Sequence, residues 1–435
     1  MKKYFLLFAV SIISFFNIYA QASKKIMSVA DMHKDIDYFY EKLLSIHPYP
    51  FLILSQEEWA QKTDSLKGSI TQPKTKKDFF LEMTKFNAYL DLHSGVHPSA
   101  KIMRAMEGKI VFPKFEQQGD SIFFEKNSEK YLLLSVGKTS TKEIKKKFLD
   151  RNSLIEPMYR PTFLNMLRAF CNYNLVEDDI EYTYEDNNGK IYSDFFKRKK
   201  NKNKNRNKTG TSLQVDTTLS VAVMRVNTFA PTSIIDFRDS IYSYFKQLKN
   251  QNIKRLYIDI TNNSGGLVIL TGFLSGFFIE SKDEIYAGTW TAKSSEERDT
   301  QRLDFFIRQV ENGDYTQRKY TFSIQNSKPK FSGEEVFVIQ SRNSYSASAV
   351  FASLLQHYCK KCKIIGEEGE IKAFYADPLT IVLPKSKFIV SLSSMFGRFV
   401  GKEKDRGVVP DIPYSIYDPT EPISLQDLEK IIGKQ

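Results

Sequence analysis

A serine-rich turn is the first candidate for nucleophilic chemistry in this chain. The residues from Gly333 to Gly366 predict a buried strand, a short polar turn, an amphipathic helix and a second strand. The turn, SYSAS at 344–348, lies where the first strand gives way to the helix. Unpaired backbone N–H groups and the positive end of the helix dipole stabilise an alkoxide or an oxyanion at such a junction. The turn therefore suits a serine nucleophile, and its alternative role is to cap the helix.

Paired glycines follow a second buried strand. The strand is expected at 256–260, and the turn TNNSGGL at 261–267 leads from it into another apolar helix. Gly265 and Gly266 allow backbone N–H groups to point at one spot, which is how proteins hold an oxyanion or a phosphate. The alternative is a simple sharp turn.

A histidine at the end of a predicted helix is a candidate proton acceptor. This helix is expected from Lys76 and runs into LDLHS at 90–94, which contains His93. An imidazole changes its charge near neutral pH, so His93 could serve as a general base. A surface or capping role is the alternative. An earlier helix is expected at 31–47 and ends at HPYP.

The first twenty residues have the composition of a secretory signal peptide. Lys2 and Lys3 precede a short apolar run, and Ala20 and Ala22 supply small residues for cleavage. The run is too short to span a bilayer, and no later segment is apolar enough to do so. We therefore expect an exported protein, periplasmic or extracellular, without an integral membrane segment after signal cleavage.

The basic residues are concentrated in one loop. The net charge is +12 at pH 7, and the run KRKKNKNKNRNK at 197–208 holds eight Lys or Arg and no acid. We interpret this loop as a solvated surface insertion, with docking to acidic surfaces or anionic lipid as the alternative. No nucleic-acid partner is expected, because such a partner would need a basic recognition face and would bind in a strongly salt-dependent way.

The three cysteines give neither a disulfide framework nor a zinc site. Cys359 and Cys362 have the spacing of a redox motif, but they follow a helix instead of opening one after a strand. We expect a local disulfide or two buried thiols there. No metal or cofactor is expected.

Strands and helices that alternate along the chain predict an α/β fold of α+β character. Before residue 212 we expect strands at 110–115, 121–125 and 131–136, helices at 142–149 and 161–173, and a hairpin that joins 180–184 to 191–195. A larger α/β unit is expected from residue 219, with a helix at 233–250. Residues 291–330 are polar and are expected to form a long irregular connection.

Several of these stretches, taken in order, resemble the tail-specific, or C-terminal-processing, serine peptidase family. Its motifs are matched by DITNNSGGL at 259–267, SYSASAVFASLL at 344–355, GVVPD at 407–411 and LDLHS at 90–94, and HPYPF at 47–51 is similar to secreted bacterial members. The chain departs from the family pattern at several places: Thr261 stands where the family has Arg, Ala349 where it has Glu, and GEEGEI at 366–371 where it has a glycine-rich G-E-x-T-G-G.

The resemblance implies a β-rich α/β catalytic core like that of tricorn, preceded by a PDZ-like module that binds a substrate tail. It divides the chain into a signal peptide at 1–20, an N-terminal helical domain at 21–105, a degenerate PDZ-like module with the basic loop at 106–212, and the catalytic core at 213–435. It also puts the nucleophile at Ser346, with oxyanion donors near Gly265, Gly266 and Ala347.

The family has two kinds of general base, and both have a candidate here. Lysine-type members place the base shortly after a G-E-x-T segment, where Lys372 falls, and a desolvated lysine could take the proton from Ser346. Tricorn-like members use an N-terminal histidine, which His93 matches, oriented by an acid near the closing motif, such as Glu403 or Asp405. The departures from the lysine-type pattern favour His93.

These observations lead to one functional hypothesis and one alternative. We expect a secreted or periplasmic serine endopeptidase that cleaves extended or unfolded polypeptides, without a metal or cofactor. The alternative is a catalytically inactive protein that binds peptides or serves as a scaffold and keeps the peptidase fold. The sequence leaves the oligomeric state open.

Overall fold

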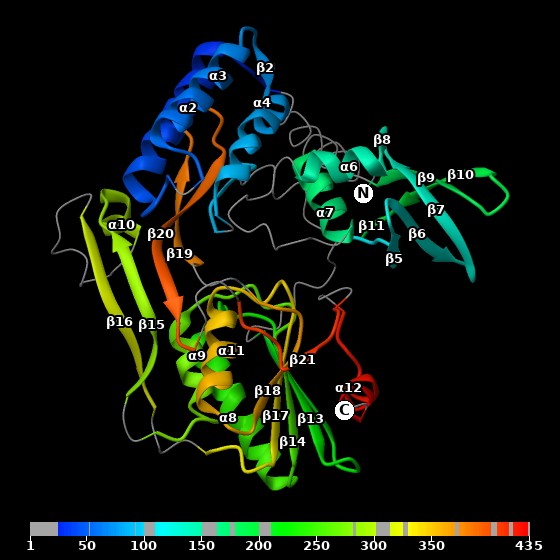
Figure 1. Ribbon diagram of the computed structural model, residues 1–435, viewed down its shortest axis with the longest axis vertical. Coiled ribbons are helices and arrows are strands. Elements are labelled where there is room, and N and C mark those ends of the chain that lie inside the picture. The colour runs from blue at the N-terminus through cyan, green and yellow to red at the C-terminus, as the bar shows by residue number, and fades with distance from the viewer. Residues whose placement is uncertain are drawn as a thin grey trace, which may run out of the picture. The chain divides into compact units, whose positions relative to one another are not determined.

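The computed structural model divides into two compact units, shown in Figure 1. Unit 1 comprises Met1–Lys202, Lys293–Asp314 and Asp377–Ser394, and unit 2 comprises Asn203–Ala292, Tyr315–Ala376 and Met395–Gln435. The structure describes residues 25–51, 53–91, 93–99, 109–149, 163–174, 179–199, 210–281, 284–301, 314–324, 329–369, 374–401, 407–416 and 421–433. The predicted signal peptide and most of the basic loop therefore lie outside the described residues.

Unit 1 begins with a group of short helices. Ser28, Ser55 and Thr75 each cap a helix with a side-chain oxygen, and Ser55 forms a full capping box with Glu58. The first and last of these helices were predicted, and the middle one was not. The elements are β1 (Ile26–Met27), α2 (Val29–Ile46), α3 (Gln56–Ser69), β2 (Lys74–Thr75), α4 (Lys76–Met83), the 3₁₀ helix η1 (Thr84–Tyr89) and β3 (Gly95–His97).

An antiparallel sheet with two helices forms the middle of unit 1. Its strand order is β10-β9-β7-β6-β5, with β8 paired to β7. The predicted hairpin is confirmed, because Ile191 pairs with Glu185 and Phe196 with Ile180. The strands of this sheet are β5 (Phe115–Gln118), β6 (Ser121–Lys126), β7 (Glu129–Val136), β8 (Thr139–Ser140), β9 (Ile180–Glu185) and β10 (Ile191–Phe196), and the helices are α6 (Thr141–Leu149) and α7 (Phe163–Tyr173). The short strands β4 (Lys109–Ile110) and β11 (Arg198–Lys199) pair with each other in a separate sheet.

A six-stranded sheet is the centre of unit 2. Its order is β12-β13-β14-β17-β18-β21, and every neighbouring pair from β13 to β21 is parallel. Crossover helices follow three of these strands, as parallel pairing requires. The strands are β12 (Thr211–Asp216), β13 (Val221–Val226), β14 (Arg255–Asp259), β17 (Glu335–Gln340), β18 (Cys362–Gly366) and β21 (Ile412–Pro413).

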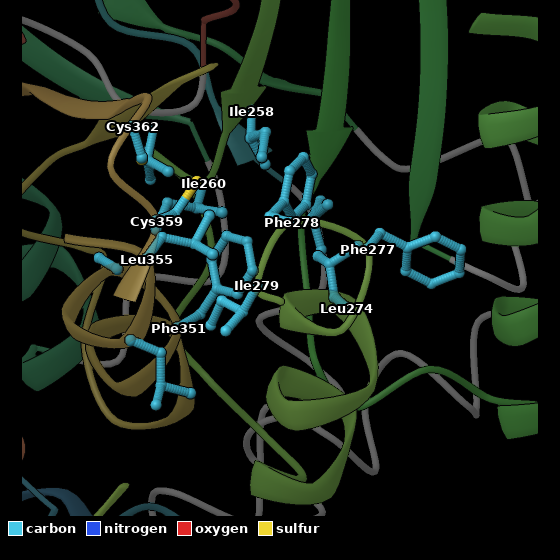
Figure 2. Packing of buried hydrophobic residues seen from close by; sticks show 14 of the residues in the cluster. Ile258, Ile260, Leu274, Phe277, Phe278, Ile279, Phe351, Leu355, Cys359 and Cys362 are labelled. Carbon is cyan, nitrogen blue, oxygen red and sulfur yellow. The ribbon is translucent and has the colours of Figure 1, made fainter. Parts of the chain in front are cut away.

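Helices cover both faces of this sheet because its side chains alternate between two apolar clusters. One face packs on α8 (Ile234–Asn250), α9 (Val268–Ser275) and α11 (Ala347–Tyr358), which lie on the same side of the sheet in Figure 1. Figure 2 shows Ile258 of β14 in this cluster with Leu274 of α9 and with Phe351 and Leu355 of α11. The other face packs on α12 (Leu425–Gly433) through residues such as Leu428. Glu429 of α12 also accepts hydrogen bonds from Arg255 and Tyr257, both at 2.6 Å.

The expected irregular connection at 291–330 is wrong for the residues that the structure describes. This stretch contains the end of β15 (Glu284–Lys293), α10 (Glu296–Gln301) and β16 (Tyr315–Ser323). β15 pairs antiparallel with β20 (Ile389–Phe399) in a sheet separate from the six-stranded one, for example through Trp290 and Gly397. The polar side chains misled the sequence interpretation because an exposed, solvated strand such as β16 carries no apolar run. β19 (Phe374–Val382) lies next to β20 in the same sheet.

All three cysteines are buried free thiols. Burial raises the pKa of Cys171 to about 12 and also raises the pKa values of Cys359 and Cys362. A thiol reacts as its thiolate, so these residues are poorly suited to redox catalysis. Among the described residues, no helix is long and apolar enough to cross a bilayer, and no group of His, Cys, Asp and Glu forms a metal cluster.

Candidate active site

Two turns of unit 2 meet because the strands before them are parallel neighbours. β14 and β17 pair in register, with Asp259 beside Ile339, so both strands end at the same edge of the sheet. The N–H of Ile260 still donates to the carbonyl of Ile339, at 3.0 Å. The glycine turn follows β14 and the serine turn follows β17. Crevices at the carboxyl ends of parallel strands are the usual ligand sites of α/β folds.

Ser346 has a backbone conformation that few residues other than glycine adopt. Its φ is 58° and its ψ is −126°. Such conformations cost about 1–3 kcal/mol and persist only where the surroundings enforce them. Ser346 precedes α11, but its side chain makes no capping hydrogen bond. The capping alternative therefore does not describe Ser346, whose side chain is partly exposed at the positive end of the helix.

Gly265 lies directly against Ser346. A Cβ placed on Gly265 would lie 2.7 Å from Cβ of Ser346, 3.0 Å from the carbonyl oxygen of Tyr345 and 3.1 Å from the nitrogen of Ala347. Its φ of +103° also disfavours any other residue. Only glycine at position 265 allows the two turns to approach this closely, so the contact requires the first glycine of the pair.

Gly266 packs in the same way against a third segment. A Cβ there would lie 2.2 Å from the carbonyl carbon of Phe229, and the φ of Gly266 is +138°. The glycine turn and this segment also share two main-chain hydrogen bonds: Phe229 donates to Gly265 at 2.9 Å, and Leu267 donates to Phe229 at 2.8 Å. The segment after β13 therefore fixes the back of the glycine turn.

The backbone N–H groups around Ser346 are not equally available to an oxyanion. Gly265 donates its N–H to the side-chain oxygen of Asn263 at 2.9 Å, so this N–H is already used. Asn263 is itself fixed, because its amide donates to the carbonyl of Val226 at 2.8 Å. In the part of the chain that the structure describes, the N–H groups of Gly266 and Ala347 have no acceptor. Two of the three predicted donors are therefore available.

Two buried hydroxyls lock the serine turn to the glycine turn. Ser344 donates to the carbonyl of Ile260 at 2.6 Å and accepts the N–H of Ser341 at 3.0 Å. Ser341 donates its hydroxyl to the carbonyl of Thr261 at 2.6 Å. These two bridges set the position of the serine turn, and with it Ser346, relative to Gly265.

His93 lies in unit 1, in a turn organised around the buried carboxylate of Asp91. Nε2 of His47 donates to Asp91 Oδ2 at 2.9 Å, and the N–H of His93 donates to Asp91 Oδ1 at 2.8 Å. Burial raises the pKa of Asp91, but the hydrogen bond from His47 and the interactions with His47 and His93 outweigh it, and the pKa falls to about 2. Asp91 is therefore ionised at neutral pH.

The structure brings some of the predicted site residues together and leaves others outside its description. Gly265, Gly266, Ser346 and Ala347 form one cluster in unit 2, and His93 lies in unit 1. Lys372, Glu403 and Asp405 lie outside the described residues. The sequence did not predict the hydrogen bond between His47 and Asp91, although the two motifs that contain these residues, HPYPF and LDLHS, were recognised.

Comparisons with known proteins agree with this geometry. The family model named peptidase family S41 matches residues 220–414, which include the glycine turn, the serine turn and GVVPD. The matched region resembles peptidase family S41, so it supports a serine-type peptidase, a hydrolase of the tail-specific, or C-terminal-processing, type.

Solved structures with the same fold show how far the likeness extends. The structure of mature CPAF complexed with lactacystin has a TM-score of 0.61 and 12% identity, over 89% of this chain and 94% of that chain. A crystal structure of mature CPAF has a TM-score of 0.59 and 12% identity, over 88% and 92%. The predicted α/β fold is thereby confirmed. No curated protein sequence matches the chain.

The closing motif GVVPD stabilises the same edge of the sheet. Asp411 accepts the N–H of Ile364 in β18 at 2.7 Å. The carbonyl of Val408 accepts hydrogen bonds from the side chain of Gln340 at 2.7 Å and from the N–H of Gly369 at 3.0 Å. GVVPD therefore holds together the ends of β17 and β18, next to the turn that carries Ser346.

One departure from the family pattern has a local explanation. Thr261 stands at the Arg position, and its N–H and hydroxyl donate to Asp259 Oδ1 at 3.0 and 2.7 Å. Asp259 Oδ2 lies 3.6 Å from Nε of Arg225 on β13. The guanidinium of Arg225, on the neighbouring strand, thus lies beside the carboxylate of Asp259, the first residue of the motif. Thr261 stabilises the turn through its two hydrogen bonds to the same carboxylate.

Proposed function

We propose that the chain is an exported serine endopeptidase whose nucleophile is Ser346. The observation that carries this proposal is the contact between Ser346 and Gly265 at the carboxyl edge of a parallel sheet. A serine with a strained backbone, at the start of a helix and beside unpaired N–H groups, has the surroundings that an acyl-transfer nucleophile needs.

In the proposed reaction, Oγ of Ser346 attacks the carbonyl carbon of the peptide bond while the general base takes the hydroxyl proton. The carbonyl oxygen becomes negatively charged, and the N–H groups of Gly266 and Ala347 donate to it. The base then gives its proton to the leaving amine, and an acyl-enzyme ester remains on Ser346. Water, deprotonated by the same base, hydrolyses this ester.

His93 is the proposed base, with Glu403 as the acid that orients it, and Lys372 is the alternative. The fixed backbone of the turn at Asp91 supports His93, because a base must be held in a constant position to transfer a proton.

The proposed substrates are extended or unfolded polypeptides, and the proposed site of action is the periplasm or the extracellular space. We further propose the division inferred above: a signal peptide at 1–20, a helical domain at 21–105, a PDZ-like module at 106–212 and a catalytic core at 213–435. No nucleic-acid partner, metal or cofactor enters the mechanism.

Labelling and cleavage test the proposal together. Wild-type protein is incubated with a fluorophosphonate probe and with unfolded casein, and the modified residue is identified by mass spectrometry. We expect labelling of Ser346 and cleavage of casein, both lost in Ser346→Ala. The control is Ser243→Ala, which changes an exposed serine on α8. Absence of labelling at Ser346 together with absence of cleavage would refute the assignment.

The base is assigned by a parallel comparison. His93→Ala is expected to slow probe labelling strongly, whereas Lys372→Ala is expected to leave it near the wild-type rate. The reverse result would make Lys372 the base and leave Ser346 as nucleophile.

An inactive peptide-binding protein is the second candidate, because Thr261 and Ala349 depart from the family pattern. It predicts peptide binding that is unchanged in Ser346→Ala, with no turnover in the parent protein. Turnover of casein by the wild type excludes it.

A further inference from the structure

The carboxylate of Asp91 is held by donors from three different segments of unit 1. Asp91 is 2% exposed. Its donors are Nε2 of His47 at 2.9 Å, the N–H of His93 at 2.8 Å and the hydroxyl of Ser393 at 2.9 Å. Hydrogen bonds to a buried carboxylate are short, strong and directional. Asp91 therefore fixes the course of the backbone at His93.

His47 is fully engaged in holding Asp91. Its Nδ1 accepts the N–H of Tyr49 at 3.2 Å, so the ring proton is on Nε2, which donates to Asp91. The side chain is also buried. Since both ring nitrogens are used, His47 is not available to take a proton from Ser346, and its contribution is to orient Asp91.

The turn that carries His93 is also attached to β20. Ser393 donates its N–H to Oγ of Ser94 at 2.9 Å and its hydroxyl to Asp91 Oδ1. Val96 and Val390 continue this attachment as a pair between β3 and β20. Asp91 and Ser94, before and after His93, are thus held, and the main chain of His93 is held with them.

We propose that Asp91 is a positioning residue for His93 and that His47 positions Asp91. This inference rests on the proposed role of His93 as general base. Asp91 acts through the main chain of His93 and does not touch the substrate. A displacement of about 1 Å at a reacting group costs on the order of 100-fold in rate, so loss of these contacts should slow proton transfer from Ser346.

A double-mutant cycle tests the proposal in the full-length protein. The second-order rate constant for fluorophosphonate labelling of Ser346 is measured for wild type, Asp91→Ala, His93→Ala and the double variant, at probe concentrations high enough to follow slow labelling. We expect Asp91→Ala to slow labelling about 10- to 100-fold in the wild type and less than about 2-fold in the His93→Ala background. Asp91→Asn enters the same cycle if Asp91→Ala does not fold.

Each outcome of the cycle has a definite meaning. Equal slowing by Asp91→Ala in both backgrounds would show a general structural effect and overturn the proposal. A wild-type labelling rate for Asp91→Ala would also overturn the proposal. A wild-type rate for His93→Ala would remove His93 as the base, and this proposal with it, while labelling of Ser346 would still support the serine peptidase.

Two further variants separate positioning from stability. His47→Gln keeps an N–H donor near the position of Nε2, so we expect labelling within about 3-fold of wild type, whereas His47→Ala should be about 10-fold slower.

The matched control is Asp35→Asn, because Asp35 is also buried and accepts the N–H groups of Lys385 and Ser386 at 2.8 and 2.7 Å. It should lower the thermal midpoint and leave the labelling rate of the folded protein unchanged. Slowing equal to that of Asp91→Ala would contradict the proposal.

Discussion

Replacing Gly265 by alanine places one methyl group against the proposed nucleophile. The new carbon would lie 2.7 Å from Cβ of Ser346, and an ordinary contact begins at 3.4 Å, so the two must separate by about 0.7 Å. The alanine must also keep a φ of +103°. Strained backbone and overpacking each cost about 1–3 kcal/mol, so we expect a total loss of about 2–6 kcal/mol of unfolding free energy.

The same displacement should reduce reactivity more than stability alone explains. Moving Ser346 by a large part of 1 Å away from its N–H donors should slow fluorophosphonate labelling by on the order of 100-fold in protein that is still folded. Urea denaturation measures the loss of stability, and the labelling rate well below the denaturation midpoint measures the loss of reactivity.

The control for this experiment is Gly68→Ala. Gly68 lies in α3, and a Cβ there would meet nothing within 4 Å. Alanine should raise the stability of the helix by up to about 1 kcal/mol and leave labelling unchanged. If Gly265→Ala labels as fast as wild type, the contact between the two turns does not position Ser346, and the reasoning is refuted.

Three more predictions follow from buried groups. Ser344→Ala removes the hydroxyl that joins the two turns and leaves a buried carbonyl and a buried N–H without that partner, so urea denaturation should show a loss of about 1–3 kcal/mol. The pKa of Asp91 is lowered from 3.8 to about 2, so its ionised form contributes about 2 kcal/mol to the unfolding free energy above pH 4, and this contribution is lost as the pH falls to about 2. Asp91→Asn should remove this part of the acid dependence of stability. An unchanged loss of stability between pH 4 and pH 2 would contradict the prediction. The buried cysteines have raised pKa values, so native protein at pH 7.5 should resist iodoacetamide and urea-unfolded protein should react at all three, as measured by mass spectrometry.

The sequence predicted the elements whose signals are local. The strand and helix that flank Ser346, the hairpin of β9 and β10, and the helix that begins after Ser233 all appear where apolar periodicity and capping residues placed them. Each of these signals lies within one window of the chain, where propensity and burial agree. The resemblance to the family added the expectation that the glycine turn and the serine turn lie together in one site.

The elements that were missed lacked such a local signal. α3 has few apolar residues, among them Trp59 and Leu66, and its one clear mark is the capping box of Ser55 and Glu58. The pair of His47 and Asp91 joins residues 44 positions apart, and no periodicity reports such a contact. Only the fold could show that the histidine of HPYPF serves the carboxylate of LDLHS.

The backbone of Ser346 bears on the choice between an active peptidase and an inactive binding protein. A strained conformation costs about 1–3 kcal/mol, and a protein that only binds peptides gains nothing from maintaining it. The strained turn packs directly against Gly265, where a Cβ would collide with Ser346, and is held by two buried serine bridges. The departures at Thr261 and Ala349 leave all of these contacts intact, because Thr261 bonds to Asp259 and Ala349 is buried in the core cluster. An inactive descendant would be stabilised by relaxing this turn, so the retained geometry favours turnover.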